Sequence, residues 1–424
     1  MNYFGTDGIR GIAHKFPDCR LAYACGNALC ALKNQPKVVL CRDTRPSGTP
    51  LSHAFAAGVT TGGGNVSDYG VLPTPAVSLL IQRERADFGA VISASHNPAE
   101  YNGIKIFTET GEKAEDPLLE KLESAFFTTV HGDTDGSYTA CDGKEYLAFL
   151  QAHAGDLSDL RVVLDCANGA TVDVAPAVFE RAGATVSVIG RGSGKFINDG
   201  CGALHPQKMS RLVVATKSDL GFSFDGDGDR VIACDASGNI LDGDDILYVL
   251  ARHFLPKGGT VVGTVQTNGG VVQSLAARNV ELLRADVGDR YVLAMLKRTG
   301  ATLGGESSGH ILLPSILPSG DGVLAALLLS SLLRTENTLC EIEKYAQETR
   351  NVPVRDKVRV LGDEKLSLFL EEERRKLSGG RIIVRASGTE PVIRILAEGK
   401  NRRETEECAD RLEAYIFALC EKDE

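Results

Sequence analysis

Hydrophobic and polar positions alternate along the chain in blocks that follow a strand, loop and helix order. Short aliphatic runs at 38–40, 162–164 and 261–265 each pass directly into a polar or glycine-bearing loop. A stretch with helical spacing of apolar positions follows, such as Val272 and Leu275 after the third run. This order predicts parallel α/β units. Their separation of about 100 to 120 residues suggests three similar modules, with chance likeness among α/β units as the alternative.

Polar and glycine-rich seams divide this pattern into segments. The seams lie at 131–137, at 256–259 and near 351–353. Each of the first two precedes a new apolar strand pattern, as expected where one folding unit ends and another begins. We therefore predict four domains, with the boundaries 1–150, 151–255, 256–348 and 349–424.

The last segment has a different composition of elements. We expect an amphipathic acidic helix at about 341–348, just before the seam. Beyond the seam, a charged helical stretch at 363–376 is followed by strand patterns at 381–384 and 392–396 and by a C-terminal helix. This order indicates a smaller α+β unit. The predicted fold class is thus α/β, with three similar mixed α/β domains and a smaller α+β C-terminal domain around a central cleft.

Composition and charge narrow the classes of partner. The chain has 424 residues, 43% hydrophobic, which is enough for several buried cores. Its net charge of −10 argues against nucleic acid or an anionic membrane as a partner. A small anionic substrate remains compatible with this charge, provided that basic groups gather locally around it.

Three observations favour a cytoplasmic protein. The longest apolar run, at 322–333, is shorter than the ~20 residues that span a bilayer. The N-terminus has neither a basic region nor an apolar stretch typical of a signal peptide. The 11 cysteines include no Cys-x-x-Cys pair, which suits reduced thiols.

The first loop with candidate chemistry is Ser-Ala-Ser-His-Asn-Pro at 93–98, directly after an apolar run. A serine on a tight loop that leaves a strand is a plausible nucleophile, because the strand fixes the backbone while the loop presents the hydroxyl. Turn and capping chemistry is the alternative. Lys105 follows closely and can enter the same cleft, although an ordinary surface lysine has the same sequence signal.

The second loop carries three alternating aspartates, Asp225, Asp227 and Asp229, followed by Arg230. The intervening glycines let the backbone curl so that the three carboxylates face one hard cation. The pattern is not that of an EF-hand, because Arg230 occupies the position of its required glycine. It favours an octahedral Mg²⁺ site with positions open to a phosphate, and an acidic turn in a solvated hairpin is the alternative.

The third and fourth loops have the composition of sugar and phosphate sites. Residues 304–310 read Gly-Gly-Glu-Ser-Ser-Gly-His, whose carboxylate and hydroxyls can bind vicinal sugar hydroxyls and whose histidine can titrate near neutrality. Residues 385–394 combine two arginines, two hydroxyl residues and a glycine between strands, which suits a phosphate clamp. A flexible turn and an ordinary hairpin turn are the respective alternatives. The chain has neither a Walker A sequence nor a G-x-G-x-x-G fingerprint.

Taken together and in this order, these loops and the N-terminal Phe-Gly-Thr-Asp-Gly-Ile-Arg-Gly at 4–11 resemble the α-D-phosphohexomutase family over the length of the chain. Within it, residues 4–11, 288–292 and 387–391 are most similar to the bacterial branch that acts on glucosamine phosphates. Three features differ from that branch: Ser307 occupies a position that is usually Gln, the chain is somewhat short for the group, and residues 100–103 are one residue tighter than in many members and closer to phosphomannomutase/phosphoglucomutase.

The resemblance implies a reaction. Ser95 would be carried as a phosphoserine, and Mg²⁺ would be held by its phosphate with Asp225, Asp227 and Asp229. Glucosamine 6-phosphate and glucosamine 1-phosphate would interconvert through glucosamine 1,6-bisphosphate, which is both intermediate and activator.

The resemblance also implies roles for the remaining loop residues. Lys105 and His310 are candidates for proton transfer, Arg10 would lie against the phosphoserine, and His96 and Arg230 would support the surrounding loops. Glu306 and Ser308 would bind sugar hydroxyls. The non-reacting phosphate would be held by Arg385, Ser387, Gly388, Thr389 and Arg394.

Three alternatives stay open. Phosphomannomutase/phosphoglucomutase activity changes only the sugar. A metal-dependent sugar phosphatase changes the acceptor to water, and a non-catalytic sugar-phosphate sensor keeps only the binding. A homodimer is expected from base rates alone.

Overall fold

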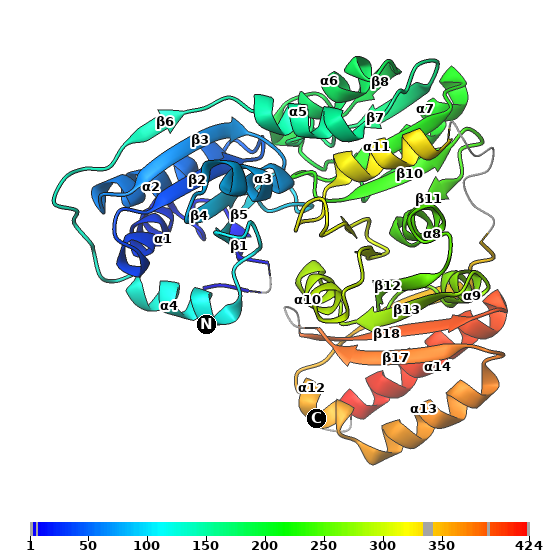
Figure 1. The fold of residues 1–424 in the computed structure, drawn as a ribbon. Coiled ribbons are helices and arrows are strands. Elements are labelled where there is room, and N and C mark those ends of the chain that lie inside the picture. The colour runs from blue at the N-terminus through cyan, green and yellow to red at the C-terminus, as the bar shows by residue number, and fades with distance from the viewer. Residues whose placement is uncertain (1–2, 6, 334–341, 388–390, 422–424) are drawn as a thin grey trace.

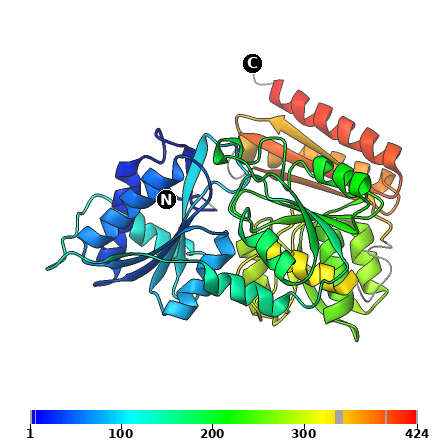
Figure 2. The same cartoon turned by 90° about the horizontal axis from the view of Figure 1, so that it is seen from above.

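The computed structural model describes residues 3–5, 7–333, 342–387 and 391–421, and four sheets follow one another along its chain. Figure 1 places the first sheet and its helices on one side, with the second, third and fourth sheets stacked beside it. In the view from above, the first unit again stands apart from the other three (Figure 2). The predicted fold class, three mixed α/β units and a smaller α+β unit, is confirmed.

The first sheet has the order β1-β5-β4-β2-β3-β6. Its strands are β1 (Ile9–Ile12), β2 (Lys37–Arg42), β3 (Asn65–Val71), β4 (Phe88–Ile92), β5 (Tyr101–Thr108) and β6 (Tyr138–Ala140). Strands β2, β3 and β4 run parallel, whereas β5 runs antiparallel to β4 and β1. Its helices are α1 (Cys19–Leu32), α2 (Gly48–Thr61), α3 (Thr74–Glu84) and α4 (Asp116–Ala125).

The aliphatic run on β2 is buried on both faces of this sheet. Val38 and Leu40 pack in the core with α1 and α2, whereas Val39 and Cys41 pack in the core with α3. Successive side chains of a strand point to opposite faces, so a strand covered on both sides needs a continuous apolar run rather than an alternating one.

The second sheet has the order β11-β10-β9-β7-β8. Its strands are β7 (Arg161–Asp165), β8 (Thr185–Ile189), β9 (Leu220–Phe224), β10 (Val231–Asp235) and β11 (Ile240–Leu241). The helices in this part of the chain are α5 (Lys144–His153), α6 (Val174–Arg181), the 3₁₀ turn η1 (Gly194–Phe196) and α7 (Gln207–Thr216). Helix α5 crosses the boundary predicted at residue 150.

The third sheet has the order β13-β12-β14-β15. Its strands are β12 (Gly259–Thr264), β13 (Val280–Ala285), β14 (Gly304–Gly305) and β15 (Ile311–Leu312). The helices are α8 (Gly243–Phe254), α9 (Gly269–Ala276), α10 (Asp289–Thr299) and α11 (Gly322–Leu333). Helix α11 is apolar over most of its circumference and lies in the largest core, which also takes side chains from the first and second units. A helix of this kind is stable only when it is surrounded.

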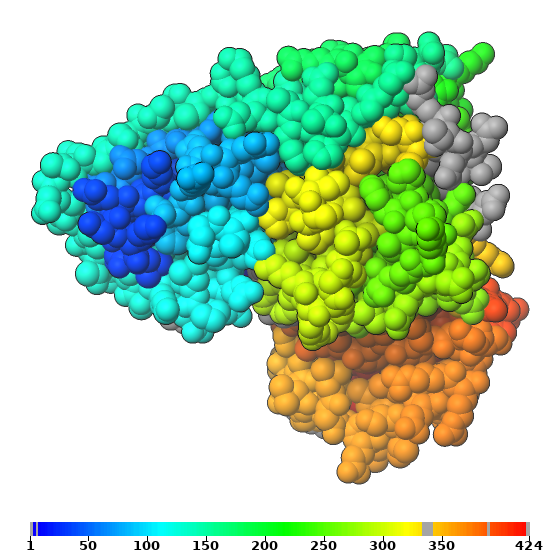
Figure 3. All heavy atoms as spheres, in the orientation of Figure 1, coloured from blue at the N-terminus to red at the C-terminus, as the bar shows by residue number. Residues whose placement is uncertain are grey.

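The fourth sheet has the order β16-β18-β17 and forms the smaller unit at the bottom of Figure 1. Its strands are β16 (Ala346–Pro353), β17 (Arg381–Ala386) and β18 (Val392–Gly399), and its helices are α12 (Lys357–Leu361), α13 (Glu364–Lys376) and α14 (Arg402–Glu421). The space-filling view shows this unit as a separate lobe below the third one (Figure 3).

The prediction of an acidic helix at 341–348 is wrong for residues 342–348, the part of this range that the structure describes. Residues from Ala346 onward form β16, which pairs antiparallel with β18 over its full length from Ala346↔Gly399 to Pro353↔Val392. This long-range ladder satisfies the backbone groups that a short helix would have satisfied locally. The last sheet therefore begins before residue 349.

No helix among the described residues is long and apolar enough to cross a membrane.

Candidate active site

Ser95 occupies a tight loop immediately after β4. Its backbone lies in the left-handed region, with φ of 49°, and its side chain is almost completely buried. A non-glycine residue in this region carries backbone strain, which the surroundings must hold in place. The Ser95 N–H donates to Ser93 Oγ at 2.9 Å, and Ser93 Oγ donates to Asp43 Oδ2 at 2.6 Å.

Arg45 holds the carbonyl groups of this loop. Its guanidinium donates to Ser95 O at 2.9 Å, to Asn97 O at 2.7 Å and to Tyr101 O at 3.0 Å. It also pairs with Asp43 at 2.8 Å, and both side chains are fully buried. Asn198 adds a second donor to Ser95 O, at 2.8 Å. The loop is thus positioned by a planar cation whose five donors have fixed directions.

The three aspartates lie on the loop between β9 and β10. One carboxylate oxygen of each lies within 4.8 Å of the others, and all three side chains are buried. Gly226 allows the loop to approach the serine, because a Cβ there would lie only 2.5 Å from Ser95 O. Gly228 has a φ of 73°, which a glycine adopts freely.

The tertiary structure brings Ser95 and the acidic loop together. Ser95 Oγ donates to Asp225 Oδ2 at 2.7 Å across 130 residues of sequence. The buried oxygen Asp227 Oδ1 has no hydrogen-bond partner in the described part of the chain. Buried carboxylate oxygens without donors are costly unless a cation satisfies them. The donor set, which consists of oxygens alone, fits a hard divalent cation.

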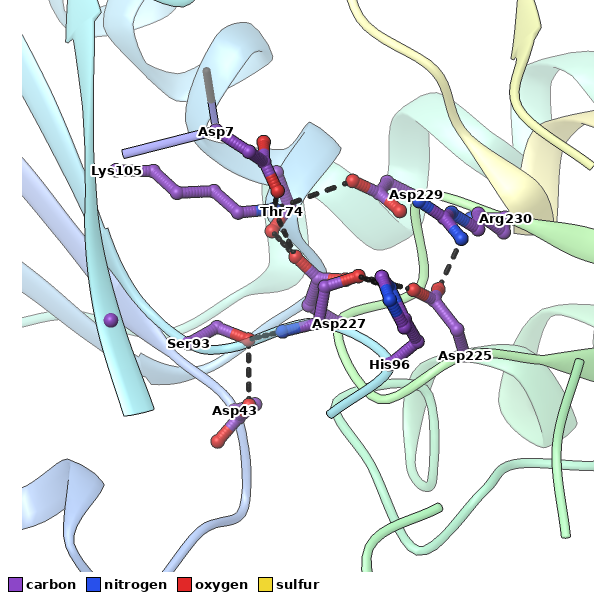
Figure 4. Close-up of polar contacts among 12 residues, drawn as sticks. Asp7, Asp43, Thr74, Ser93, His96, Lys105, Asp225, Asp227, Asp229 and Arg230 are labelled. Atoms are coloured by element: carbon purple, nitrogen blue, oxygen red, sulfur yellow. Dashed lines mark hydrogen bonds and ion pairs between the residues drawn. The ribbon is translucent and has the colours of Figure 1, made fainter. Parts of the chain in front are cut away.

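Lys105 Nζ points into this cluster and lies 2.7 Å from Asp227 Oδ2 (Figure 4). Burial opposes its charge, but Asp227 and Asp7 outweigh burial and raise the pKa of the Lys105 ammonium above its ordinary value. Thr74 Oγ1 donates to the same Asp227 oxygen at 2.6 Å. By contrast, burial and the charges of Asp229 and Asp227 raise the pKa of Asp225 well above its usual range. Added positive charge would therefore be stabilised here.

His310 approaches the cluster from the third unit. It follows the loop between β14 and β15, and its Nε2 lies 3.0 Å from Asp229 Oδ1. Its Nδ1 lies 3.4 Å from Glu306 Oε2. Burial opposes the charged imidazolium, but Asp229 and Glu306 outweigh it and raise the pKa of His310 to about 10. The side chain is therefore a cation at neutral pH.

His96 and Arg10 also lie close to the Ser95 loop. His96 Nδ1 is 3.4 Å from Ser95 Oγ. Burial and the charges of Arg230 and Arg10 lower the pKa of His96 to about 4, so this imidazole is neutral at pH 7. Arg10 donates to Asn97 Oδ1 at 3.1 Å and pairs with Asp7.

The other candidate residues of the second and third units lie on the loops around this cluster. The Arg230 N–H donates to Asp225 Oδ1 at 3.2 Å, and Figure 4 shows its side chain beside Asp225. Glu306 accepts the Gly288 N–H at 2.8 Å and is buried. Ser308, on the same loop, is half-buried. The structure therefore places the candidate sugar loop against the candidate metal loop.

The candidate phosphate clamp lies on the fourth sheet. Arg385 and Arg394 are directly opposite each other on β17 and β18, and both line a small hollow of about 110 Å³ that also includes Gln266 of the third unit. Burial and the neighbouring Arg394 lower the pKa of Arg385. Ser387 is buried at the end of β17. Gly388 and Thr389 lie outside the described residues.

No contact in the described part of the chain joins Arg385, Ser387 or Arg394 to Ser95 or to the aspartates. The structure thus brings together the candidate residues of three units and leaves the clamp on a separate lobe. Sequence reasoning overlooked the residues that hold the site, namely Asp7, Asp43, Arg45, Thr74, Lys113 and Asn198. A signal for three of them existed, because Asp43 and Arg45 lie in the polar loop that follows the first aliphatic run and Asp7 lies in the N-terminal motif at 4–11.

Comparisons with known proteins agree with this arrangement of loops. Models of the phosphoglucomutase/phosphomannomutase alpha/beta/alpha domains I, II and III match residues 1–131, 144–238 and 242–349, and the model of the C-terminal domain matches 343–414. Among solved structures, a phosphoglucomutase/phosphomannomutase family protein from Burkholderia thailandensis has a TM-score of 0.82 at 23% identity and covers 99% of this chain and 97% of its own.

Curated relatives match at higher identity. A phosphoglucosamine mutase of Thermus thermophilus is 44% identical over 99% of this chain and 98% of its own length. One from Pelotomaculum thermopropionicum is 43% identical over 96% and 97%, and one from Bacillus subtilis is 39% identical over 97% of each. The chain therefore belongs to the phosphoglucomutase/phosphomannomutase family, the α-D-phosphohexomutases, and is similar over its whole length to the bacterial phosphoglucosamine mutases within it.

Proposed function

We propose that the protein is an intramolecular phosphotransferase that interconverts glucosamine 6-phosphate and glucosamine 1-phosphate. The observation that carries the proposal is the hydrogen bond from Ser95 Oγ to Asp225, in a buried cluster of three aspartates with two cations beside it. A phosphoryl carrier needs a presented hydroxyl and neutralising charge at the same place. Relatives at 39 to 44% identity that are named phosphoglucosamine mutases support the choice of sugar.

The residues fit a bound Mg²⁺. Asp225, Asp227 and Asp229 would hold it together with an oxygen of phosphorylated Ser95. When bound, the ion would withdraw charge from the phosphoryl group and offset the negative charges around it. A solved N-acetylphosphoglucosamine mutase of Aspergillus fumigatus, 18% identical with a TM-score of 0.71, is described as a complex with GlcNAc-6P and magnesium.

The chain's own residues account for the transfer. A sugar 1- or 6-hydroxyl forms a new P–O bond as the bond from phosphorus to Ser95 Oγ breaks, and this gives glucosamine 1,6-bisphosphate. The attacking hydroxyl loses its proton as the Ser95 oxygen leaves, and the Ser95 oxygen takes up a proton and returns to a hydroxyl. Lys105 and His310 are protonated in the resting site, so each begins as a donor and can accept a proton only after donating one. Return transfer from the other sugar position restores the phosphoserine.

Other residues would orient the sugar and keep out water. Glu306 and Ser308 would bind sugar hydroxyls, whereas Arg10, His96 and Arg230 would support the loop around Ser95. The non-reacting phosphate would be held by Arg385, Ser387, Gly388, Thr389 and Arg394. A clamp on a separate lobe can serve both orientations of the bisphosphate, and closure of that lobe would limit hydrolysis of the phosphoenzyme.

The first test measures turnover of purified, phosphorylated protein on glucosamine, glucose and mannose phosphates with Mg²⁺. We expect the highest kcat/KM on glucosamine phosphates. A clear preference for glucose or mannose phosphate would reject the sugar and favour the phosphomannomutase/phosphoglucomutase alternative.

The second test addresses the chemistry through Ser95. Intact mass of the resting protein should show one covalent phosphate, and Ser95→Ala should remove both the phosphate and all transfer. Full activity in Ser95→Ala would contradict the mechanism. Stoichiometric release of inorganic phosphate would indicate a phosphatase, and binding without turnover would indicate a sensor.

Chelation of divalent ions tests the metal. Transfer should disappear with EDTA and return with Mg²⁺, because three clustered carboxylates and a phosphoserine repel one another without a cation. Transfer at full rate in EDTA would contradict this part of the proposal.

The homodimer and the cytoplasmic location stay predictions.

A further inference from the structure

Lys113 bridges the first and third units of the molecule. Its Nζ lies 2.7 Å from Asp7 Oδ1 and 2.8 Å from Asp289 Oδ2. Asp7 belongs to the segment ahead of β1, whereas Asp289 begins α10. The Lys113 side chain is only 17% exposed, so water screens these two contacts less than it would screen a surface pair.

On the side of the first unit, the bridge leads to the Ser95 loop. Asp7 also pairs with Arg10 and lies 3.7 Å from Lys105 Nζ. Burial opposes its ionisation, but Lys105, Lys113 and Arg10 together hold the pKa of the Asp7 carboxyl far below its usual range. Arg10 in turn donates to Asn97, two residues beyond Ser95.

On the side of the third unit, the bridge leads to the sugar loop. The residue before Asp289 is Gly288, and its N–H donates to Glu306 Oε1 at 2.8 Å. Glu306 Oε2 lies 3.4 Å from His310 Nδ1. Whatever fixes the start of α10 therefore also fixes the carboxylate proposed to bind the sugar.

The two sides meet again at the aspartate loop, so the polar contacts form a closed ring. His310 Nε2 lies 3.0 Å from Asp229, and Asp229 lies 3.5 Å from Lys105, which returns to Asp7. The ring runs through Asp7, Lys113, Asp289 with Gly288, Glu306, His310, Asp229 and Lys105. Within the ring, the Lys113–Asp289 pair is the direct contact between the first and third units.

A cavity of about 430 Å³ lies along the seam where Lys113 crosses, and both Lys113 and Asp289 line it. The atoms that face a hollow have fewer van der Waals contacts than atoms in a packed core, so the ion pairs contribute to the connection here. Two further pairs cross the same seam, Arg290–Asp116 at 2.9 Å and the half-exposed Lys297–Glu112, and neither side chain of the second pair takes part in the ring.

We propose that Lys113 is a positioning residue for the phosphoryl transfer. It holds the start of α10, and through Gly288 it holds Glu306 in register with the Ser95 loop of the first unit. This inference rests on the proposed mutase function. Lys113 itself contacts neither Ser95 nor the aspartate trio, so its positioning effect passes through Asp7 and Asp289, and its charge also acts at a distance on Asp229.

The test compares Lys113→Met with Lys297→Met, a matched change that removes a lysine from the same seam. Misplacement of a binding group by about 1 Å costs up to roughly 100-fold in rate, so Lys113→Met should lower kcat/KM by about 10- to 100-fold. Lys297→Met should stay within about twofold of the wild type. Lys113→Arg keeps the charge and should recover part of the loss. Equal activities of the two methionine variants would overturn the inference.

A second pair of variants keeps the test decisive if Lys113→Met fails to fold. Asp289→Asn preserves the shape of its side chain and weakens the same ion pair, so it should lower kcat/KM in the same direction while the thermal unfolding midpoint changes little. In a folded Lys113→Arg/Asp289→Asn double variant, the two losses should not multiply, because both act on one contact. Multiplicative losses, or a loss of stability with unchanged kcat and KM, would contradict a positioning role.

The activity of the wild-type protein distinguishes failure of this inference from failure of the proposed function. All variants are measured on the sugar phosphate that the wild type turns over fastest. An active wild type with an unaffected Lys113→Met would overturn the inference alone. A wild type that acts on none of the three sugar phosphates would overturn the proposed function, and the inference with it.

Discussion

At the scale of single residues, the site depends on side chains that do no chemistry themselves. Arg45 donates to four backbone carbonyls of the Ser95 loop and its surroundings, and it neutralises the fully buried Asp43. Burial raises the pKa of Asp43, and Arg45 counteracts this rise. One buried ion pair therefore helps to maintain the strained backbone of Ser95, together with the donor from Asn198.

We predict that Arg45→Met destabilises the protein strongly. Removing one partner of a buried pair leaves the other charge uncompensated and costs about 3–5 kcal/mol. The measurement is the free energy of unfolding in urea, and Arg42→Met serves as the control. Arg42 is half-buried and donates to one carbonyl, Asp43 O, so its loss should cost less than about 1 kcal/mol. Similar values for both variants would contradict the role given to Arg45.

A second prediction at this scale concerns Asp244, a buried carboxyl at the start of α8. Burial and the nearby charge of Asp242 raise its pKa to about 7. The folded protein therefore favours the protonated form, and ionisation costs no stability below the unfolded pKa of about 4. The cost grows as the pH rises from about 4 to about 7 and is complete above that range, where it reaches roughly 4 kcal/mol.

Asp244→Asn should therefore stabilise the protein at pH 8 but not at pH 4. The asparagine carbonyl can still accept the Asn268 N–H, which donates to Asp244 at 2.8 Å. Urea unfolding of both proteins at the two pH values gives the result. A difference between variant and wild type that does not change with pH would show that Asp244 ionises normally.

At the scale of elements, local patterns predicted most strands, and partners far away in the sequence decided the exceptions. The three aliphatic runs became β2, β7 and β12, because continuous apolar runs suit strands buried on both faces. The acidic stretch at 341–348 was expected to be helical, yet β16 begins within it. Pairing with β18 outweighed local preference, and the sequence around the stretch carries no sign of that partner.

The contact between two loops leads to a prediction at this scale. We expect Gly226→Ala to weaken Mg²⁺ binding and lower activity at least tenfold, because its Cβ would lie 2.5 Å from the Ser95 carbonyl oxygen and force the loops apart. The control is Gly48→Ala, whose nearest neighbour, Arg42 Cδ, would lie at an ordinary 3.5 Å. Titration of activity with Mg²⁺ measures both. A Gly226→Ala protein with the wild-type Mg²⁺ dependence would contradict the close approach.

At the scale of the whole molecule, the fourth unit is joined to the third by a polar contact. Arg381 donates to Val265 O at 2.5 Å and to Thr267 O at 2.6 Å, and it pairs with Glu398 at 2.6 Å. Arg381 and Arg385 are four residues apart on β17 and therefore share one face of the sheet. The joint thus sets the direction in which the proposed phosphate clamp points.

We predict that Arg381→Met raises KM for the sugar phosphate about tenfold, because a loosened lobe presents its clamp less often in the binding orientation. Phosphorylation of Ser95 should persist, since the first and second units are unchanged. Arg350→Met is the matched control: Arg350 has similar exposure, but it pairs with Glu348, Asp410 and Glu413 inside the fourth unit. Equal KM values for the two variants would contradict the role of the joint.

The sequence by itself determined the chemical groups of this protein and the loops that carry them. Ser95, the alternating aspartates and the arginine pair are recognisable because a few adjacent residues decide how a strand ends and what its loop presents. Only the tertiary structure decided which loops meet, because contact across 130 residues depends on the order of strands and the packing of units. The same holds for Arg45 under the Ser95 loop, for Lys113 between two units and for the strand at residue 346. Each depends on a partner that local spacing does not encode.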